Sequence, residues 1–223
     1  MTPTIQADDH RRVSEAVAAA EALSDGEIVA MVAPQSDAYH DAALHWTVLV
    51  MLGAPALLAL VPAEAIERAL SWGWPGGPVY GSLLGGIALT EIILFLACRL
   101  AFAPIPMRMA LTPESTKIRR VRRRAIQFFR AGAEKRTVGR SGVLIYLSLA
   151  ERRAEIVADE AIHARVDADV WTEAMDALIA HLREGRAGDG LVEAIGKVGA
   201  ILAAHFPKTP TDPDELPDRL IEL

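Results

Sequence analysis

The stretch SGVLIYLSLAERRAEIVAD, residues 141–159, holds the clearest β-strand pattern in this 223-residue sequence. Residues 143–149 are an almost unbroken apolar run, which is typical of a strand buried on both faces. The polar segment AERR (150–153) indicates a turn, and a second apolar run follows at residues 154–158. The pattern predicts an antiparallel β-hairpin.

A further buried strand is predicted upstream. The segment EIVAMVA, residues 27–33, is a short apolar run between Gly26 and Pro34. A helix with one apolar face is predicted before it, over residues 8–23. Because a helical segment separates this strand from the one at 143–149, the connection is a crossover and the two strands are expected to be parallel.

Three more helices are predicted after residue 111. The first begins with Thr112 as its N-cap and Pro113 in its first turn. Its apolar face is formed by Ile118, Val121, Ala125, Phe128, Phe129 and Gly132. The second lies within the segment 168–186, where Gly185 ends it. The third covers residues 189–206. The proline-rich tail, residues 207–223, is predicted to be extended.

Two long apolar segments interrupt this α/β pattern, at residues 42–61 and 79–103. A membrane-spanning helix needs about 20 mostly apolar residues, and both segments reach that length. Aromatic residues suited to the headgroup region flank them: Trp46, Trp72, Trp74 and Tyr80. The alternative is a pair of helices buried in a soluble core, which a chain of this size can hardly enclose. The predicted fold class is therefore α/β, a small mixed sheet in an α/β/α sandwich interrupted by a two-helix transmembrane hairpin.

The distribution of positive charge predicts the orientation of this hairpin. Arg68 is the one Lys or Arg residue in its connection, whereas Arg11 and Arg12 precede the first segment. Many basic residues follow the second: Arg108, Lys117, Arg119, Arg120, Arg122, Arg123 and Arg124. The positive-inside rule places both termini in the cytoplasm, so we expect a multi-pass membrane protein. The arginine run is interpreted as a cationic face toward membrane lipid. Nucleic acid is not an expected partner, because the polar face lacks interleaved aromatic residues and the net charge is −6.

Glu91 lies near the middle of the second apolar segment. An intramembrane carboxylate is a functional-site hypothesis by default. Gly81 and Gly85 have the small-xxx-small spacing that allows close packing on Gly53 or Ala56, or on another copy of the chain. Glu91 is interpreted as a structural or oligomer-contact residue; the alternative is proton or ion handling in a channel or transporter subunit.

Acidic residues at the predicted strand ends form the candidate catalytic site. Ser36 and Asp37 follow the first strand, and Asp159 and Glu160 follow the last. Open sheets bind ligands at strand ends, and carboxylates there suit Ca²⁺ or Mg²⁺. Asp37 and Asp159 are the candidate catalytic residues, with Glu160 as a third metal ligand, in a metal-assisted phosphatase. The alternative is that both aspartates are turn and helix-capping residues.

The sequence resembles the TPM domain family, in its bacterial integral-membrane branch. The resembling stretches are residues 26–39, 125–162 and 190–207, with Trp171 and the tail at 214–223. The resemblance implies a compact α/β/α domain in a multi-pass protein of the bacterial inner (plasma) membrane. It also implies a LemA-type membrane protein as a partner, divalent-cation binding in some members, and weak phosphatase activity in some. VADEAI, residues 157–162, stands where the phosphatase-like members have a glycine pair, which argues against transferring that activity.

The predicted organisation follows from these segments. Residues 8–41 and 108–206 form two parts of one cytoplasmic TPM-like domain, residues 42–103 form the membrane hairpin, and residues 207–223 form the tail. The leading functional hypothesis is a non-enzymatic assembly or envelope-maintenance factor that acts through protein contacts. It includes self-association as a homo-oligomer. The metal-assisted phosphatase and the channel or transporter subunit are the alternatives.

Overall fold

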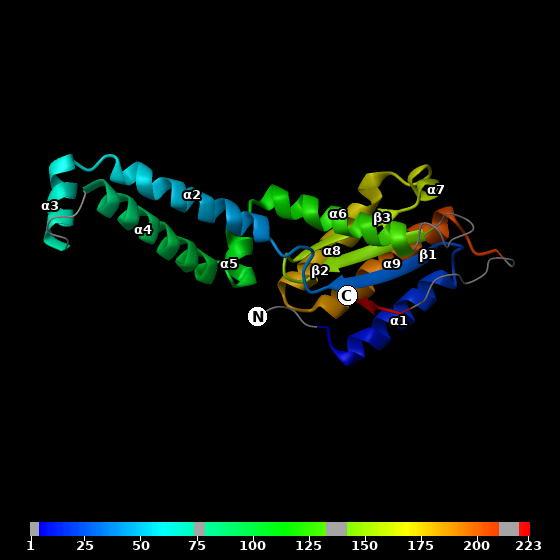
Figure 1. The fold of residues 1–223 in the computed structure, drawn as a ribbon. Helices are drawn as coiled ribbons and strands as arrows, with labels where there is room; N and C mark the ends of the chain where they lie inside the picture. The colour runs from blue at the N-terminus through cyan, green and yellow to red at the C-terminus, as the bar shows by residue number, and fades with distance from the viewer. Residues whose placement is uncertain (1–4, 74–78, 133–141, 210–218) are drawn as a thin grey trace. The chain divides into compact units, whose positions relative to one another are not determined.

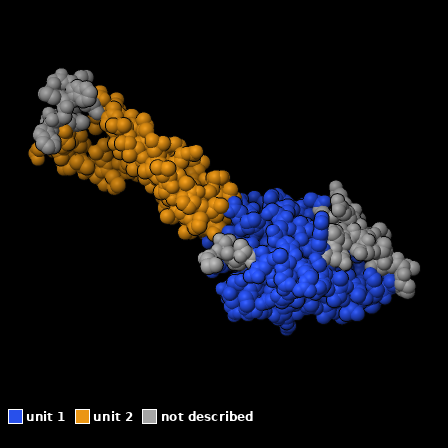
Figure 2. Space-filling model, turned by 90° about the horizontal axis from the view of Figure 1, so that it is seen from below, with its two compact units in different colours: residues 1–37, 114–223 blue, residues 38–113 orange. Residues whose placement is uncertain are grey.

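The computed structural model describes residues 5–73, 79–132, 142–209 and 219–223. The chain separates into two compact units, shown in different colours in Figure 2. The α/β unit contains Met1–Asp37 and Glu114–Leu223, and the hairpin unit contains Ala38–Pro113. Along the sequence, the hairpin unit is therefore an insertion between the two parts of the α/β unit.

Four strands among the described residues form one sheet, in the order β3-β2-β1-β4 (Figure 1). β1 (Glu27–Ala33) pairs in parallel with β2 (Gly142–Ser148), and β2 pairs antiparallel with β3 (Arg153–Ala158). Both pairings confirm the predicted mixed sheet. β4 (Ile221–Glu222) adds a parallel edge beside β1. The sequence predicts only an extended tail there, because two residues are too few to show the alternation of a strand.

Helices cover both faces of the sheet (Figure 1). α1 (Ala7–Glu21), α8 (Thr172–Arg183) and α9 (Ala187–His205) pack on one face, and α6 (Glu114–Gly132) packs on the other. Side chains of β1 alternate between the two cores. Ile28, Ala30 and Val32 join the α1–α8–α9 core, whereas Val29, Met31 and Ala33 meet Val121, Ala125 and Phe129 of α6. This alternation buries every residue of β1 and confirms the α/β/α sandwich.

Two glycines determine how α8 and α9 are placed. Gly185 follows α8 with φ +78°, a left-handed conformation that glycine adopts without steric cost, so the predicted helix end at this residue is confirmed. At Gly199 of α9, an added Cβ would lie 2.5 Å from the Cβ of Ala20 on α1. The two helix backbones therefore approach closely at a point where only a hydrogen fits.

The hairpin unit contains two long apolar helices, α2 (His40–Leu58) and α4 (Val79–Ala101), which pack against each other. His40–Leu58 and Leu83–Ala101 are long and apolar enough to cross a membrane, and only 6% of each span is buried. The structure thus does not form the alternative, a pair of buried core helices. The predicted aromatic group at Trp72, Trp74 and Tyr80 lies outside the described side chains.

Two shorter helices of the hairpin unit do not appear among the predicted elements. α3 (Ala63–Gly73) lies in the connection between the two apolar helices, and α5 (Ile105–Ala110) follows α4. Arg108 of α5 is buried and joins the two ends of the unit. Its guanidinium donates to the carbonyl oxygen of Ala38 (2.6 Å), the carbonyl oxygen of Ala103 (2.9 Å) and Nδ1 of His40 (2.8 Å).

The start of α6 differs from its prediction. The helix begins at Glu114, and the Thr112 hydroxyl donates back to the carbonyl oxygen of Arg108 at 2.8 Å instead of capping α6. Glu114 forms ion pairs with Lys117 (3.1 Å) and with Arg153 of β3. Ile118, predicted on the apolar face, is 40% exposed, so the buried face of α6 starts one turn later at Val121.

Candidate functional site

The carboxyl ends of β1 and β2 meet at one edge of the sheet, where Ala33 pairs with Ser148. The chain leaving β1 brings Ser36 to this edge, and the turn after β2 brings Glu151. Ser148 and Glu151 are buried, and Ser36 is partly buried. This is the edge at which open α/β sheets bind ligands, so it is the first place to look for a site.

Four side chains at this edge form a hydrogen-bonded group that we call the strand-end cluster: Ser36, Tyr146, Ser148 and Glu151. The Ser36 backbone N–H donates to Oε1 of Glu151 at 2.9 Å. The Ser36 hydroxyl donates to Oγ of Ser148 at 2.9 Å, and the Ser148 hydroxyl donates to Oε2 of Glu151. The Tyr146 hydroxyl lies 3.0 Å from Oγ of Ser36.

The direction of the last hydrogen bond follows from counting protons. A serine hydroxyl has one proton. The proton of Ser148 goes to Glu151 and that of Ser36 goes to Ser148, so Tyr146 donates to Ser36. The cluster is thus a directed chain that ends on a carboxylate, which accepts and cannot donate when ionised.

The environment of Tyr146 keeps its phenol protonated. Burial raises the pKa of Tyr146, and the negative charge of Glu151 adds to the increase, while the hydrogen bond with Ser36 opposes it. The ring packs in the core beneath α6, with its centroid 5.9 Å from that of Phe128. A raised pKa leaves the hydroxyl able to donate at neutral pH, as the directed chain requires.

Asp37 directly follows Ser36 of the strand-end cluster in the sequence, and it forms an ion pair with a residue of α6. Its Oδ1 is 3.0 Å from Nη1 of Arg120, whose side chain is 16% exposed. The carboxylate is partly exposed, at 39%. The predicted catalytic residue is therefore an ion-paired residue at the point where the chain leaves the α/β unit.

Asp159 and Glu160 lie at the other end of the sheet. Oδ2 of Asp159 accepts from the Gly142 backbone N–H at 2.9 Å, and the Asp159 N–H donates to the Gly142 carbonyl oxygen at 3.0 Å. These bonds extend the β2–β3 ladder by one pair. Asp159 is buried in the N-cap position of α7 (Glu160–His163), without a side-chain capping bond, and Glu160 is exposed.

The structure does not bring the predicted carboxylates together. Asp37 follows the carboxyl end of β1, whereas Asp159 adjoins Gly142, which pairs with Glu27 at the amino end. Seven strand residues separate these ends, a distance of about 20 Å. Among the described residues, no three His, Cys, Asp or Glu side chains are grouped to hold a metal ion.

Most of the strand-end cluster is not predicted from the sequence. The pattern indicates Ser36 as a strand-end residue, but it predicts Tyr146 and Ser148 within an apolar strand and Glu151 in a turn. A signal was present, because Tyr146 and Ser148 are two positions apart and therefore point to the same face of β2. Two polar residues on one face of a buried strand require partners.

The predicted membrane residues lie on α4. Glu91 is partly buried, and Gly81 and Gly85 are exposed. An added Cβ would meet nothing within 4 Å at Gly85, and the same holds at Gly53 of α2. The predicted close packing of Gly85 on the first helix is therefore not formed within the chain, and packing on another copy stays a prediction.

Comparison with known proteins agrees with this architecture. The TPM domain family model matches residues 107–201, which contain α6, β2, β3 and most of α9. The NMR structure of BA42 protein from the psychrophilic bacterium Bizionia argentinensis aligns over 98% of this chain and 95% of that chain, with a TM-score of 0.57 and 19% identity. That likeness shows a shared fold. No curated protein sequence matches. The family match therefore identifies a TPM domain at residues 107–201, and the α/β/α architecture agrees with it.

Proposed function

We propose that this TPM-domain protein is anchored in the bacterial inner membrane by α2 and α4. It acts without catalysis, as an assembly or envelope-maintenance factor that contacts other proteins. The observation that carries the proposal is the exposure of the hairpin unit, of whose two apolar spans only 6% is buried.

Physical chemistry makes lipid the best solvent for these helices. Exposed apolar side chains cover both of them, including Leu49, Leu52 and Leu57 on α2 and Leu89, Ile92 and Leu96 on α4. Burial of such a side chain away from water contributes about 1.5–3 kcal/mol. Soluble monomers rarely expose an apolar surface larger than a few hundred Å², so these helices are expected to be covered by lipid.

Charge supports a cytoplasmic α/β unit. Basic residues concentrate on α6, where Arg119, Arg122 and Arg123 are exposed, whereas the described connection between α2 and α4 holds only Arg68. Near an anionic membrane surface, each such charge contributes about 1 kcal/mol of attraction. The arginines of α6 are therefore proposed to face anionic lipid headgroups.

The strand-end cluster supports a role without catalysis. Each hydroxyl proton of Ser36, Ser148 and Tyr146 is already donated within the cluster. A nucleophile needs a base that can take its proton while the oxygen faces a substrate, but Ser148 is fully buried. The cluster is better suited to fixing the chain between β1 and α2. The protein partner, of the LemA type by the resemblance noted above, would then be bound through the surface of the protein.

Extraction and labelling test this proposal on the full chain. We expect the protein to stay in the membrane pellet in alkaline carbonate and to dissolve only with detergent. In a Cys98→Ala background, Glu64→Cys on α3 should react with an impermeant maleimide on intact spheroplasts. The matched Glu184→Cys variant, after α8, should react only after permeabilisation. Release by carbonate, or labelling of Glu184→Cys from outside, contradicts the anchoring or its orientation.

Partner capture tests the second half of the proposal. Mild cross-linking in native membranes, followed by purification of the full chain, should recover a membrane protein in stoichiometric amount. Hydrolysis of a phosphate ester by the purified chain, lost on substitution of Asp37 or Asp159, would instead support an enzyme.

A further inference from the structure

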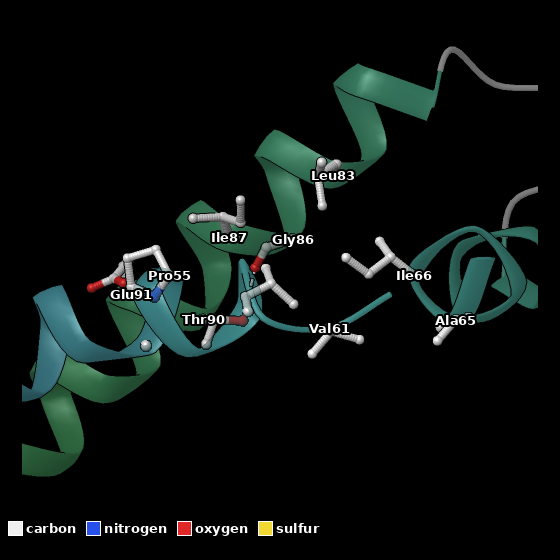
Figure 3. Close-up of a pocket in the computed structure, with 12 residues that line it drawn as sticks. Pro55, Val61, Ala65, Ile66, Leu83, Gly86, Ile87, Thr90 and Glu91 are labelled. Atoms are coloured by element: carbon white, nitrogen blue, oxygen red, sulfur yellow. Dashed lines mark hydrogen bonds between the residues drawn. The ribbon is translucent and has the colours of Figure 1, made fainter. Parts of the chain in front are cut away.

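A half-open cavity of about 410 Å³ lies in the hairpin unit, with walls from α2, α3 and α4 (Figure 3). Apolar side chains make up most of the wall, among them Leu58 of α2, Ile66 of α3 and Leu83 of α4. Its volume lies in the range of sites that take small organic ligands, about 300–1,000 Å³.

Among the described residues that line this cavity, one is ionisable, Glu91 of α4. Glu91 makes no hydrogen bond or ion pair with any described residue. The neighbouring Thr90 hydroxyl donates to the carbonyl oxygen of Gly86 at 2.8 Å, so its proton is used elsewhere. The carboxylate is therefore a polar group in an apolar cavity with its hydrogen-bonding capacity unused.

In its ionised form, such a carboxylate is stabilised by a counter-charge from outside the chain. An isolated ionised group in an apolar medium is costly unless it is paired. Arg99, on the same helix, is eight residues away, or about 12 Å along the axis, which is too far for a direct ion pair. A cation that enters the cavity would supply the missing charge, and its apolar part would occupy the remaining volume.

We propose that this cavity binds a lipophilic organic cation, a quaternary ammonium or phosphonium ion that carries apolar groups. The positive charge lies at the Glu91 carboxylate, and the apolar groups contact Leu58, Ile66 and Leu83. This inference rests on the proposed membrane location, because lipid is where such cations concentrate.

Binding is measured on the purified full chain in detergent, where membrane location does not affect the result. The probe is radiolabelled tetraphenylphosphonium, and tetraphenylborate serves as an anion of the same shape. We expect saturable binding of the cation and none of the anion. Glu91→Gln should weaken the cation's binding by about 30-fold or more, since a desolvated charge pair is lost. Glu67→Gln, an exposed residue of α3 outside the cavity lining, should leave it unchanged.

A second pair of variants tests the cavity itself. An added Cβ meets nothing within 4 Å at either Gly85 or Gly86, but only Gly86 lines the cavity. Gly86→Leu should therefore fill it and abolish binding, while Gly85→Leu should retain it.

Three results would overturn the proposal. The first is equal binding of cation and anion, and the second is full binding by the Glu91→Gln variant. The third is no cation binding by the wild-type chain, combined with a changed oligomeric state of the Glu91→Gln variant. The last result would assign Glu91 to a contact between copies. Release of the protein by carbonate would contradict the membrane location alone.

Discussion

At the scale of single residues, the strand-end cluster behaves as a chain of hydrogen bonds with one direction. Ser148 holds its centre, because it accepts from Ser36 and donates to Glu151. Its removal leaves a buried carboxylate without one donor and Ser36 without its acceptor. We expect Ser148→Ala to lower the free energy of unfolding by about 1–3 kcal/mol.

Tyr146 begins the chain, so Tyr146→Phe removes only a donor and should cost less, about 0.5–1.5 kcal/mol. Thermal unfolding of both variants in detergent, followed by circular dichroism, compares the two losses. A loss for Tyr146→Phe as large as that for Ser148→Ala would contradict the direction of the chain.

Glu155 gives a prediction about pH. This residue of β3 pairs across the strands with Tyr146. Burial raises its pKa from the usual 4.5, and the positive charges of Arg122 and Arg153 act against that shift. The folded state thus binds a proton more tightly than the unfolded chain, and stability falls as pH rises through the range just above 4.5.

We therefore expect Glu155→Gln to raise the free energy of unfolding at pH 7, and with it the unfolding temperature. The gain in free energy should be less than about 1 kcal/mol, because the side chain is partly exposed. The gain should shrink toward pH 4. Melting curves of wild type and variant across this range measure it. A gain that grows as pH falls would show that the two arginines lower the pKa of Glu155 by more than burial raises it.

Part of the candidate site could be predicted from the sequence. Ser36 and Asp37 were placed at a strand end by the apolar run before them, and the structure puts them there. The partner of Asp37 could not be predicted, because Arg120 lies on a helix 83 positions away, among many similar arginines. Asp159 was misplaced for a related reason. The turn after β2 reverses the chain, so the end of β3 lies at the opposite edge of the sheet.

At the scale of secondary-structure elements, long periodic segments were predictable and short ones were not. The three longer strands and the helices α1, α6, α8 and α9 correspond to predicted segments. α3 and α5 were missed because they lie between stronger signals and are rich in proline and glycine at their ends. β4 depends on pairing with β1, which a local pattern does not reveal.

The shortest helix of the hairpin unit carries a strong prediction about stability. Arg108 of α5 joins the segment before α2 to the segment after α4 through bonds to Ala38, His40 and Ala103. Hydrogen bonds from a charged donor contribute about 1.5–3 kcal/mol each when buried, so Arg108→Ala should cost at least about 3 kcal/mol. The Arg108→Lys variant should recover little of this loss, because lysine lacks the planar guanidinium group with its several donors.

The matched control for Arg108 is Arg119→Ala, since Arg119 is exposed on α6. Limited proteolysis in detergent reports on the hairpin unit directly. We expect new cleavage near residues 103–112 in the Arg108→Ala variant and none in the control. Equal protection of both variants would show that Arg108 is not what holds these segments together.

At the scale of the whole molecule, sheet topology separates the two places where acidic residues gather. Asp37 lies beyond one end of the sheet, paired with Arg120, and Asp159 lies at the other, bonded to Gly142. A divalent cation needs several oxygen ligands at about 2–2.6 Å, and ends about 20 Å apart cannot supply them together. The fold thus argues against a metal held jointly by the two aspartates.

This separation gives the last prediction. A cation bound at 100 times its Kd would stabilise the folded chain by about 2.7 kcal/mol, which is a shift of several degrees. We expect millimolar Mg²⁺ or Ca²⁺ to leave the unfolding temperature of the full chain in detergent unchanged. If a shift appears, Asp37→Asn, Asp159→Asn and the exposed control Asp176→Asn locate its source. Loss of the shift in either of the first two variants, but not in the control, would restore a metal-dependent site at that end of the sheet. It would also reopen phosphate-ester hydrolysis as the function.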